Sequence, residues 1–185
     1  IWGESNIGYL AGDPVSWGPS ACELAVVGGG ALAGRAYPGF MTPEITDPAV
    51  RAIAEEIAAD PANTSFMKRG VKPLFYAGAQ CRIMIVGQAP GRIAEETGIV
   101  WNDRSGDRLR DWMGIDRDTF YRSGKLAIVP MDFYFPGTGK SGDLPPRKDF
   151  ADTWHPRLLA LMPKLEMTIL VGAYAPRRYL HLPSS

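Results

Sequence analysis

Three short apolar runs in the second half of the chain constrain its fold more than any other feature of the sequence. They cover Ile83–Val86, Leu126–Met131 and Met167–Val171, and a glycine directly follows the first and the last. Such a run, without alternating polar residues, is typical of a parallel strand buried on both faces. Helical patterns separate the runs, over Ser105–Met113, which begins with a serine cap, and over about 149–162. This alternation predicts an α/β fold with a parallel central sheet and right-handed crossovers.

The segment after the first apolar run has the features of a binding loop. Ligands of parallel α/β sheets bind outside the carboxyl ends of the strands, so Gly87–Gly91, Asp132–Gly137 and the residues from Gly172 onwards should share one rim. Two glycines and a proline fix a tight turn in the first of these segments, and its backbone N–H groups can point at a small planar or anionic ligand. The Gln88 amide can donate and accept hydrogen bonds together, which suits the edge of a base.

An aromatic residue and a second amide follow this loop ten residues later, at Trp101-Asn102. The alternative interpretation is an ordinary turn at a strand exit, with the tryptophan in the core. Each feature alone favours that alternative. Their combination on the rim of a parallel sheet favours a pocket.

The first 70 residues differ from the rest, and we treat residues 1–70 and 71–185 as separate parts. Asp47-Pro48 predicts a helix over about 48–60, with Asp as N-cap and Pro at the first helical position. Earlier, Leu24–Val27 reads as a strand and runs into Gly28–Gly34. That pattern allows a dinucleotide-binding turn, but no acidic residue follows a second strand about 20 residues on, so a plain glycine turn is the better interpretation.

Composition and charge narrow the class of protein. Two cysteines, Cys22 and Cys81, exclude a disulfide scaffold and four-cysteine zinc or iron–sulfur sites, and we expect no metal or cofactor. No membrane-spanning run or signal pattern is evident, so we expect a cytoplasmic protein. Residues 1–67 carry two basic and eight acidic side chains, whereas residues 68–185 carry 18 basic and 12 acidic ones. A basic half fits a surface that binds a polyanion.

One phosphate-binding motif is excluded. Gly139-Lys140-Ser141 matches the end of a P-loop, but Tyr134 stands where that motif needs its first glycine. Pro145-Pro146 also follows where a helix should begin.

The residues around the binding loop resemble motif 1 of the uracil-DNA glycosylase superfamily, and specifically a bacterial branch whose loop reads G-Q-A-P-G. The similarity covers about residues 71–180. It is carried by Val86–Gly91, Thr97-Gly98, Trp101–Leu109, Ile128–Met131, Phe135–Lys140, Asp143–Arg147 and Trp154–Leu158.

The resemblance implies a three-layer αβα sandwich around a four-stranded parallel sheet. It also implies a monomer that flips uracil out of single- or double-stranded DNA and hydrolyses its N-glycosidic bond without a metal. The loop residues Gly87, Ala89, Pro90 and Gly91 would then hold the base and a water, and Gln88 would contact the base edge. Trp101 takes the place of the family's stacking aromatic, and Asn102 would lie beside it.

The departures from the family pattern concern the catalytic groups. Ala89 stands where some branches carry the acidic residue that activates water, so the identity of that group stays open. The uracil-reading asparagine after the second strand has no clear counterpart. Asp132 is the nearest polar candidate, with a filler of the core rim as the alternative. His155 lies within a helical pattern and is expected to be structural.

The family's second motif, His-Pro-Ser after a fourth strand, is not found in the chain. His181-Leu182-Pro183-Ser184 echoes it but directly follows the helix after the third strand. The chain begins at Ile1 rather than Met, so we expect a piece of a longer protein that lacks the last strand and exposes a sheet edge. Uracil excision by this piece should be weak.

We therefore expect a uracil-DNA glycosylase-like protein of base excision repair, with the base preference open. A catalytically impaired relative that binds DNA or a base is the first alternative. A nucleotide-binding protein that uses Gly28–Gly34 is the second.

Overall fold

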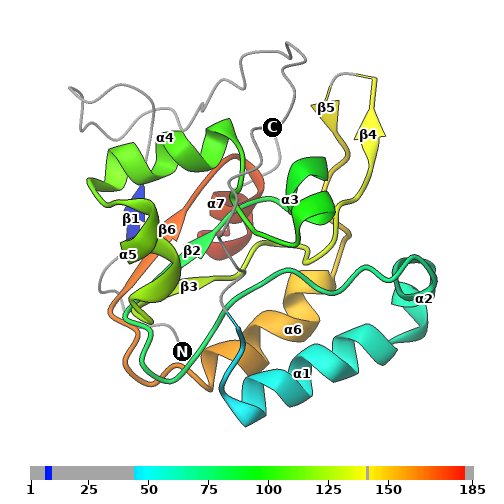
Figure 1. Ribbon diagram of the computed structural model, residues 1–185, viewed down its shortest axis with the longest axis horizontal. Coiled ribbons are helices and arrows are strands. Elements are labelled where there is room, and N and C mark those ends of the chain that lie inside the picture. The colour runs from blue at the N-terminus through cyan, green and yellow to red at the C-terminus, as the bar shows by residue number, and fades with distance from the viewer. Residues whose placement is uncertain (1–6, 10–43, 141, 182–185) are drawn as a thin grey trace.

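A parallel four-stranded sheet lies at the centre of the computed structural model, which describes residues 7–9, 44–140 and 142–181 (Figure 1). The strand order is β1-β6-β2-β3, and all neighbouring pairs are parallel. The predicted α/β class and parallel sheet are thus confirmed. The strands are β1 (Ile7–Tyr9), β2 (Ile83–Val86), β3 (Leu126–Ile128) and β6 (Met167–Leu170).

The second apolar run forms a shorter strand than its sequence predicts, because β3 ends at Ile128 although the run continues to Met131. Pro130 explains the difference, since it has no N–H to donate to a regular ladder. Its neighbours still follow the adjacent strand: Val129 N donates to Ile85 O at 2.9 Å and Met131 N to Gly87 O at 2.8 Å.

The outer edge of β6 is covered, and the expectation of an exposed edge there is wrong. β1 pairs with β6 in parallel, with Ile7 opposite Thr168 and Tyr9 opposite Leu170. The fourth strand of the sheet therefore comes from the N-terminal segment, which lies outside the stretch that resembles the family. The predicted strand Leu24–Val27 and the glycine turn Gly28–Gly34 lie outside the described residues.

Helices cover both faces of the sheet, and side chains along β2, β3 and β6 alternate between two cores. Met84 and Val86 point into a core shared with α1, α6 and α7, whereas Ile85 points into a second core shared with α3, α4 and α5. This confirms the three-layer arrangement. None of the helices in the described ranges is long and apolar enough to cross a membrane. The helices are α1 (Pro48–Ala59), a 3-10 turn η1 (Pro61–Asn63), α2 (Thr64–Lys68), α3 (Arg92–Thr97), α4 (Arg104–Met113), α5 (Arg117–Arg122), α6 (Phe150–Leu159) and α7 (Tyr174–Tyr179).

Of the two predicted helix caps, one is found in the structure and the other is a different residue. At the start of α1 the Asp47 side chain accepts from Ala49 N at 2.9 Å, as predicted. α4 begins earlier than predicted, and its cap is Asp103 rather than Ser105. Asp103 has the extended backbone that an N-cap needs, and its Oδ1 accepts from Gly106 N at 3.0 Å. Ser105 is already helical, and its hydroxyl hydrogen-bonds to Asp103 Oδ1.

A small hairpin stands apart from the sheet, beside α3 in Figure 1. It consists of β4 (Thr138–Gly139) and β5 (Gly142–Asp143), which pair antiparallel. Gly139 and Lys140 thus belong to a hairpin, and no helix begins there, which confirms that this segment is not a P-loop.

Leu158→Ala tests the core between the sheet and α6. Leu158 is completely buried, so its truncation should lower the free energy of unfolding by about 2–5 kcal/mol, through lost burial and the cavity left behind. Met67→Ala is the matched control, because Met67 is 46% exposed and its loss should change stability by no more than about 0.5 kcal/mol. Urea unfolding of the two variants measures the difference, and equal effects would contradict this packing.

Candidate functional site

The loop after β2 and the segment after β3 are joined at the rim of the sheet. Met131 N donates to Gly87 O at 2.8 Å, and Asp132 N donates to Gln88 O at 3.2 Å. On the other side of β2, Val171 N donates to Val86 O at 2.9 Å. The three segments expected to share one rim therefore leave the sheet side by side, and Gly91 then serves as the N-cap of α3.

Trp101 lies directly against the loop. A Cβ added to Gly87 would come within 2.8 Å of Trp101 Cζ2, so only a glycine fits beneath the indole in this position. The backbone of Trp101 has a φ of 56° and is held by α4. A Cβ on Gly106 would come within 1.8 Å of Trp101 O, and Arg110 Nη1 donates to the same oxygen at 3.2 Å. The half-buried ring also packs against the core of α3, α4 and α5, so it is both a core residue and a wall of the loop.

The second predicted amide, Asn102, faces the interior. Its side chain is buried, its Oδ1 accepts from Arg117 Nη2, and its Nδ2 donates to Thr97 Oγ1 at 3.2 Å. The amide thus ties the α3–α4 connection to the end of α3 and to the start of α5. Asn102 would have to leave these partners to contact a ligand.

Gln88 connects the loop to the hairpin and keeps one acceptor available. Its Nε2 donates to Leu144 O at 3.0 Å, 56 residues further along the chain. Within the described residues, its Oε1 has no hydrogen-bond partner. The rest of the loop is only partly exposed: Ala89 and Gly91 are half-buried, and Pro90 is buried.

Asp132 lies beneath the rim and is occupied by an arginine. The carboxylate is 1% exposed, and its two oxygens accept from Arg147 Nε at 2.7 Å and from Arg147 Nη2 at 2.8 Å. It also accepts from the backbone N–H groups of Tyr134 and Arg147, at 3.1 and 3.2 Å. This geometry fixes the segment before α6 to the end of β3. It leaves the carboxylate with four protein donors and little capacity for a substrate.

The same arginine reaches a residue that sequence reasoning missed. Arg147 Nη1 donates at 2.6 Å to Oδ1 of Asn63, which is 1% exposed and donates in turn to Ile57 O at 2.7 Å. The guanidinium also lies 4.4 Å from the ring centre of Phe150. Asn63 and Arg147 are 84 residues apart, and no local pattern in the sequence links them.

A second missed residue, Asp143, lies next to the loop. A Cβ on Gly91 would be 3.8 Å from Asp143 Oδ2 and 3.7 Å from Asp103 Oδ2. Asp143 is exposed, and the partial desolvation of its carboxylate raises its pKa; Arg92 opposes this increase and Asp103 adds to it. Asp143 belongs to one of the segments on which the family resemblance rests. Its position close to Gly91 is evident only from the folded hairpin.

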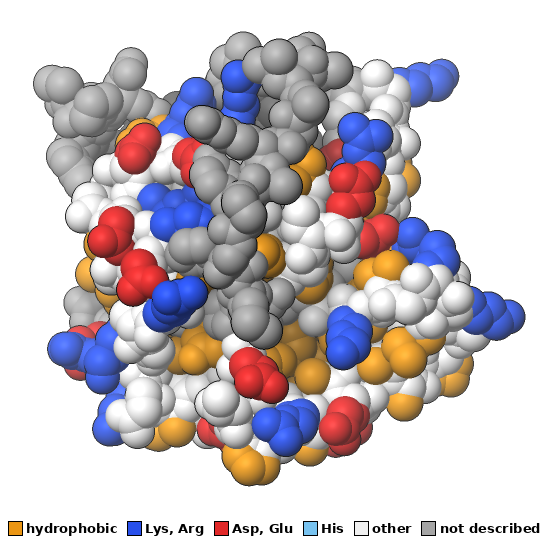
Figure 2. Space-filling model, viewed as in Figure 1, with side chains coloured by type: hydrophobic (Ala, Val, Ile, Leu, Met, Phe, Trp, Pro, Cys, Tyr) orange, Lys and Arg blue, Asp and Glu red, His pale blue; other side chains and the backbone are white. Residues whose placement is uncertain are grey.

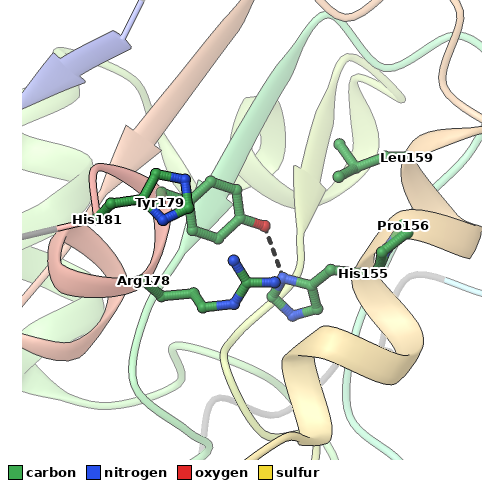
Figure 3. Close-up of a pocket in the computed structure, with 6 residues that line it drawn as sticks. All are labelled: His155, Pro156, Leu159, Arg178, Tyr179 and His181. Atoms are coloured by element: carbon green, nitrogen blue, oxygen red, sulfur yellow. Dashed lines mark hydrogen bonds between the residues drawn. The ribbon is translucent and has the colours of Figure 1, made fainter. Parts of the chain in front are cut away.

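The two histidines line a separate small cavity of about 30 Å³, too small for a base (Figure 3). His155 is buried in α6 between Pro130 O, at 2.9 Å from Nε2, and Tyr179 Oη, at 2.6 Å from Nδ1. Because a carbonyl oxygen can only accept, Nε2 carries the proton and Nδ1 accepts from the tyrosine. Burial lowers the pKa of His155 to about 4, so the ring is neutral at pH 7. His181 lies on the far side of this cavity.

Part of the chain matches a known protein family. The family described as "Uracil DNA glycosylase superfamily" matches residues 74–185, which is more than half of the chain. The matched region contains the Gly87–Gly91 loop, Trp101, Asp132 and the hairpin. Asn63, the partner of Arg147, lies before the matched region.

Arg147→Ala tests the buried ion pair. Without the guanidinium, the carboxylate of Asp132 would remain buried and unpaired, which should lower the free energy of unfolding by about 3–5 kcal/mol. Arg82→Ala is the control, because Arg82 and Glu166 are both more than half exposed and solvent screens such surface pairs, so that their loss changes stability little. Chemical denaturation measures both. If Arg147→Ala cost no more than Arg82→Ala, the pair would not hold this region together.

The buried His155 predicts an acid-sensitive stability. Above about pH 6.5 the ring is neutral in both the folded and the unfolded state. Between about pH 6.5 and 4 only the unfolded chain binds the proton, so the free energy of unfolding should fall by up to about 3 kcal/mol as the pH decreases. Denaturation of the parent and of His155→Gln across this range measures the effect. The variant should lose this part of the slope and His181→Gln should keep it; equal slopes in all three proteins would contradict the assignment.

Proposed function

The chain belongs to the uracil DNA glycosylase superfamily, and from that premise we propose that it hydrolyses the N-glycosidic bond of uracil, or of a related deaminated base, in DNA. It would do so in the cytoplasm as a monomer, in base excision repair. The observation that carries this proposal is the tight loop at the carboxyl end of β2, with Trp101 against Gly87 and the Gln88 amide beside it.

The loop offers the contacts that a flipped base needs, namely an aromatic surface and polar groups for its hydrogen-bonding edge. The half-buried indole of Trp101 would provide the surface. The N–H groups of Ala89 and Gly91 have no acceptor within the described residues. They would donate to the uracil oxygen on which negative charge develops as the bond breaks, which is where fixed donors accelerate a reaction most.

The available atom of Gln88 would favour uracil over cytosine. Its Nε2 is already bonded to Leu144 O, so Oε1, an acceptor, is the atom left for a base. The N3 position of uracil carries a hydrogen and can donate to it, whereas N3 of cytosine is itself an acceptor. An acceptor facing an acceptor leaves a polar group unpaired, and this penalty discriminates between the bases.

Binding to the DNA backbone would use the basic half of the chain. Residues 68–185 carry a net excess of six positive charges. On the face shown in Figure 2, however, basic and acidic side chains are interspersed and form no single basic patch. We therefore expect moderate affinity that decreases with salt, because the release of counterions from the phosphates becomes less favourable as the salt concentration rises.

A binding protein without catalytic activity is the second candidate function, and two observations favour it. The loop carries Ala89 where a carboxylate could activate water, and Asp132 is bonded to Arg147. Such a relative would hold uracil-containing DNA without releasing the base.

The experiment is release of uracil from a labelled oligonucleotide with one uracil, together with salt-dependent binding of the same strand. We expect release of free uracil that leaves an abasic site. Binding without release would support the second candidate. Absence of both would contradict the proposed function.

Trp101→Ala tests the pocket in the same assays. Loss of base stacking should weaken binding of the uracil-containing strand by about 1–3 kcal/mol. Trp101→Phe is the matched control and should retain most of the affinity, because it keeps an aromatic surface against Gly87. The melting temperature of each variant separates an effect on binding from an effect on folding. Unchanged affinity in folded Trp101→Ala would leave Trp101 with a role in the core alone.

A further inference from the structure

The β4–β5 hairpin brings a carboxylate to the edge of the base loop. Asp143 is the last residue of β5, where it pairs with Thr138, and the next residue is fixed at both ends of its backbone. Leu144 N donates to Gly137 O at 2.8 Å, and Leu144 O accepts from Gln88 Nε2 at 3.0 Å. The position of Asp143 is therefore tied to the side chain expected to contact the base.

Two carboxylates lie against Gly91, and only one of them has a structural role. Asp103 caps α4, since its Oδ1 accepts from Gly106 N at 3.0 Å. Asp143 Oδ2 lies 3.8 Å from the Cβ position of Gly91, and within the described residues the Asp143 carboxylate has no hydrogen-bond partner. Asp143 is exposed, so its carboxylate is open to solvent and to a ligand held in the loop.

We propose that Asp143 is the general base of the reaction, the group that accepts the proton of the attacking water. This inference rests on the proposed function. The oxygen of a water molecule between Gly91 and Asp143 forms a bond to C1′ of the flipped nucleotide, and the bond from C1′ to N1 of uracil breaks. The electron pair of that bond leaves with the uracil. The water proton passes to the Asp143 carboxylate and then to solvent, and the uracil anion takes up a proton from water.

The surroundings of Asp143 suit this role. Arg92 on α3 and Asp103 at the start of α4 are the charged groups that act on it. Partial desolvation and Asp103 raise its pKa, and Arg92 limits the increase. A carboxylate with a raised pKa is a stronger base, which favours general base catalysis.

Gly91 gives access to the space in front of Asp143. Its φ of −80° is open to any residue, and a Cβ there would make only ordinary contacts with the two carboxylates. Gly91→Ala should therefore fold, while its methyl group would occupy the place proposed for the water. It is a steric probe that leaves every charge unchanged.

Asp143→Asn is the decisive variant, because it keeps the size of the side chain and removes its basicity. We expect kcat for uracil release to fall by about 100-fold or more, and binding of the uracil-containing strand to remain within about threefold of the parent. The rate of the parent should decrease at acidic pH as Asp143 is protonated, and the variant should lose that acidic limb. Asp111→Asn, an equal charge change at an exposed position on α4, should leave both rate and profile unchanged. Gly91→Ala should lower kcat without lowering the melting temperature.

The outcomes separate this inference from the function on which it rests. A parent that releases no uracil would overturn both. A parent that is active, with Asp143→Asn at more than half its rate and with the same pH profile, would overturn the role of Asp143 alone. Loss of strand binding in Asp143→Asn equal to its loss of rate would also overturn it, because Asp143 would then act in binding.

Discussion

The buried contact between Asp132 and Arg147 is the interaction on which the geometry of the rim depends. It joins the end of β3 to the segment before α6, and Asn63 extends it to the turn after α1. A buried charge is stable only if it is paired and hydrogen-bonded. Each group in this network meets that condition, since Asp132 has four donors and Asn63 uses both ends of its amide. Asp132 is in turn bonded through its backbone N–H to Gln88 O, so the base loop rests on this network.

The central sheet could be predicted because its signal is local. Strands buried on both faces must be apolar throughout, and the runs ending at Val86 and Val171 have that property in the sequence itself. The structure differs from the predicted elements where one residue changes the local geometry, as Pro130 does after β3 and Asp103 does at the start of α4. β1 could not be predicted, because a three-residue strand gains its identity only from pairing with β6.

The sequence predicted the loop of the site, but not the arrangement of polar side chains around it. Gly87, Gln88 and Trp101 stood out because a tight turn and an aromatic ring are visible in the sequence, and the structure brings them together. What the sequence could not show is which polar atoms the fold already uses. Asn102 and Asp132 read as available groups and have internal partners. The sequence does not mark Asp143 as a site residue, because only the antiparallel pairing of β4 with β5 brings it close to Gly91.

The hydrogen bond from Gln88 Nε2 to Leu144 O affects both the hairpin and the choice of base. It is exposed, and a bond of this kind stabilises by only about 0.5–1.5 kcal/mol, so it holds the hairpin to the loop only weakly. It also commits the donor of the amide and leaves the acceptor. A base that pairs with Oε1 uses the side of Gln88 that the hairpin does not need, and the hairpin stays in place while the base is bound. A base that required Nε2 would first have to break the hydrogen bond to Leu144 O, which would also free the neighbouring Asp143 to move. Base selection and the position of Asp143 thus depend on the same amide group.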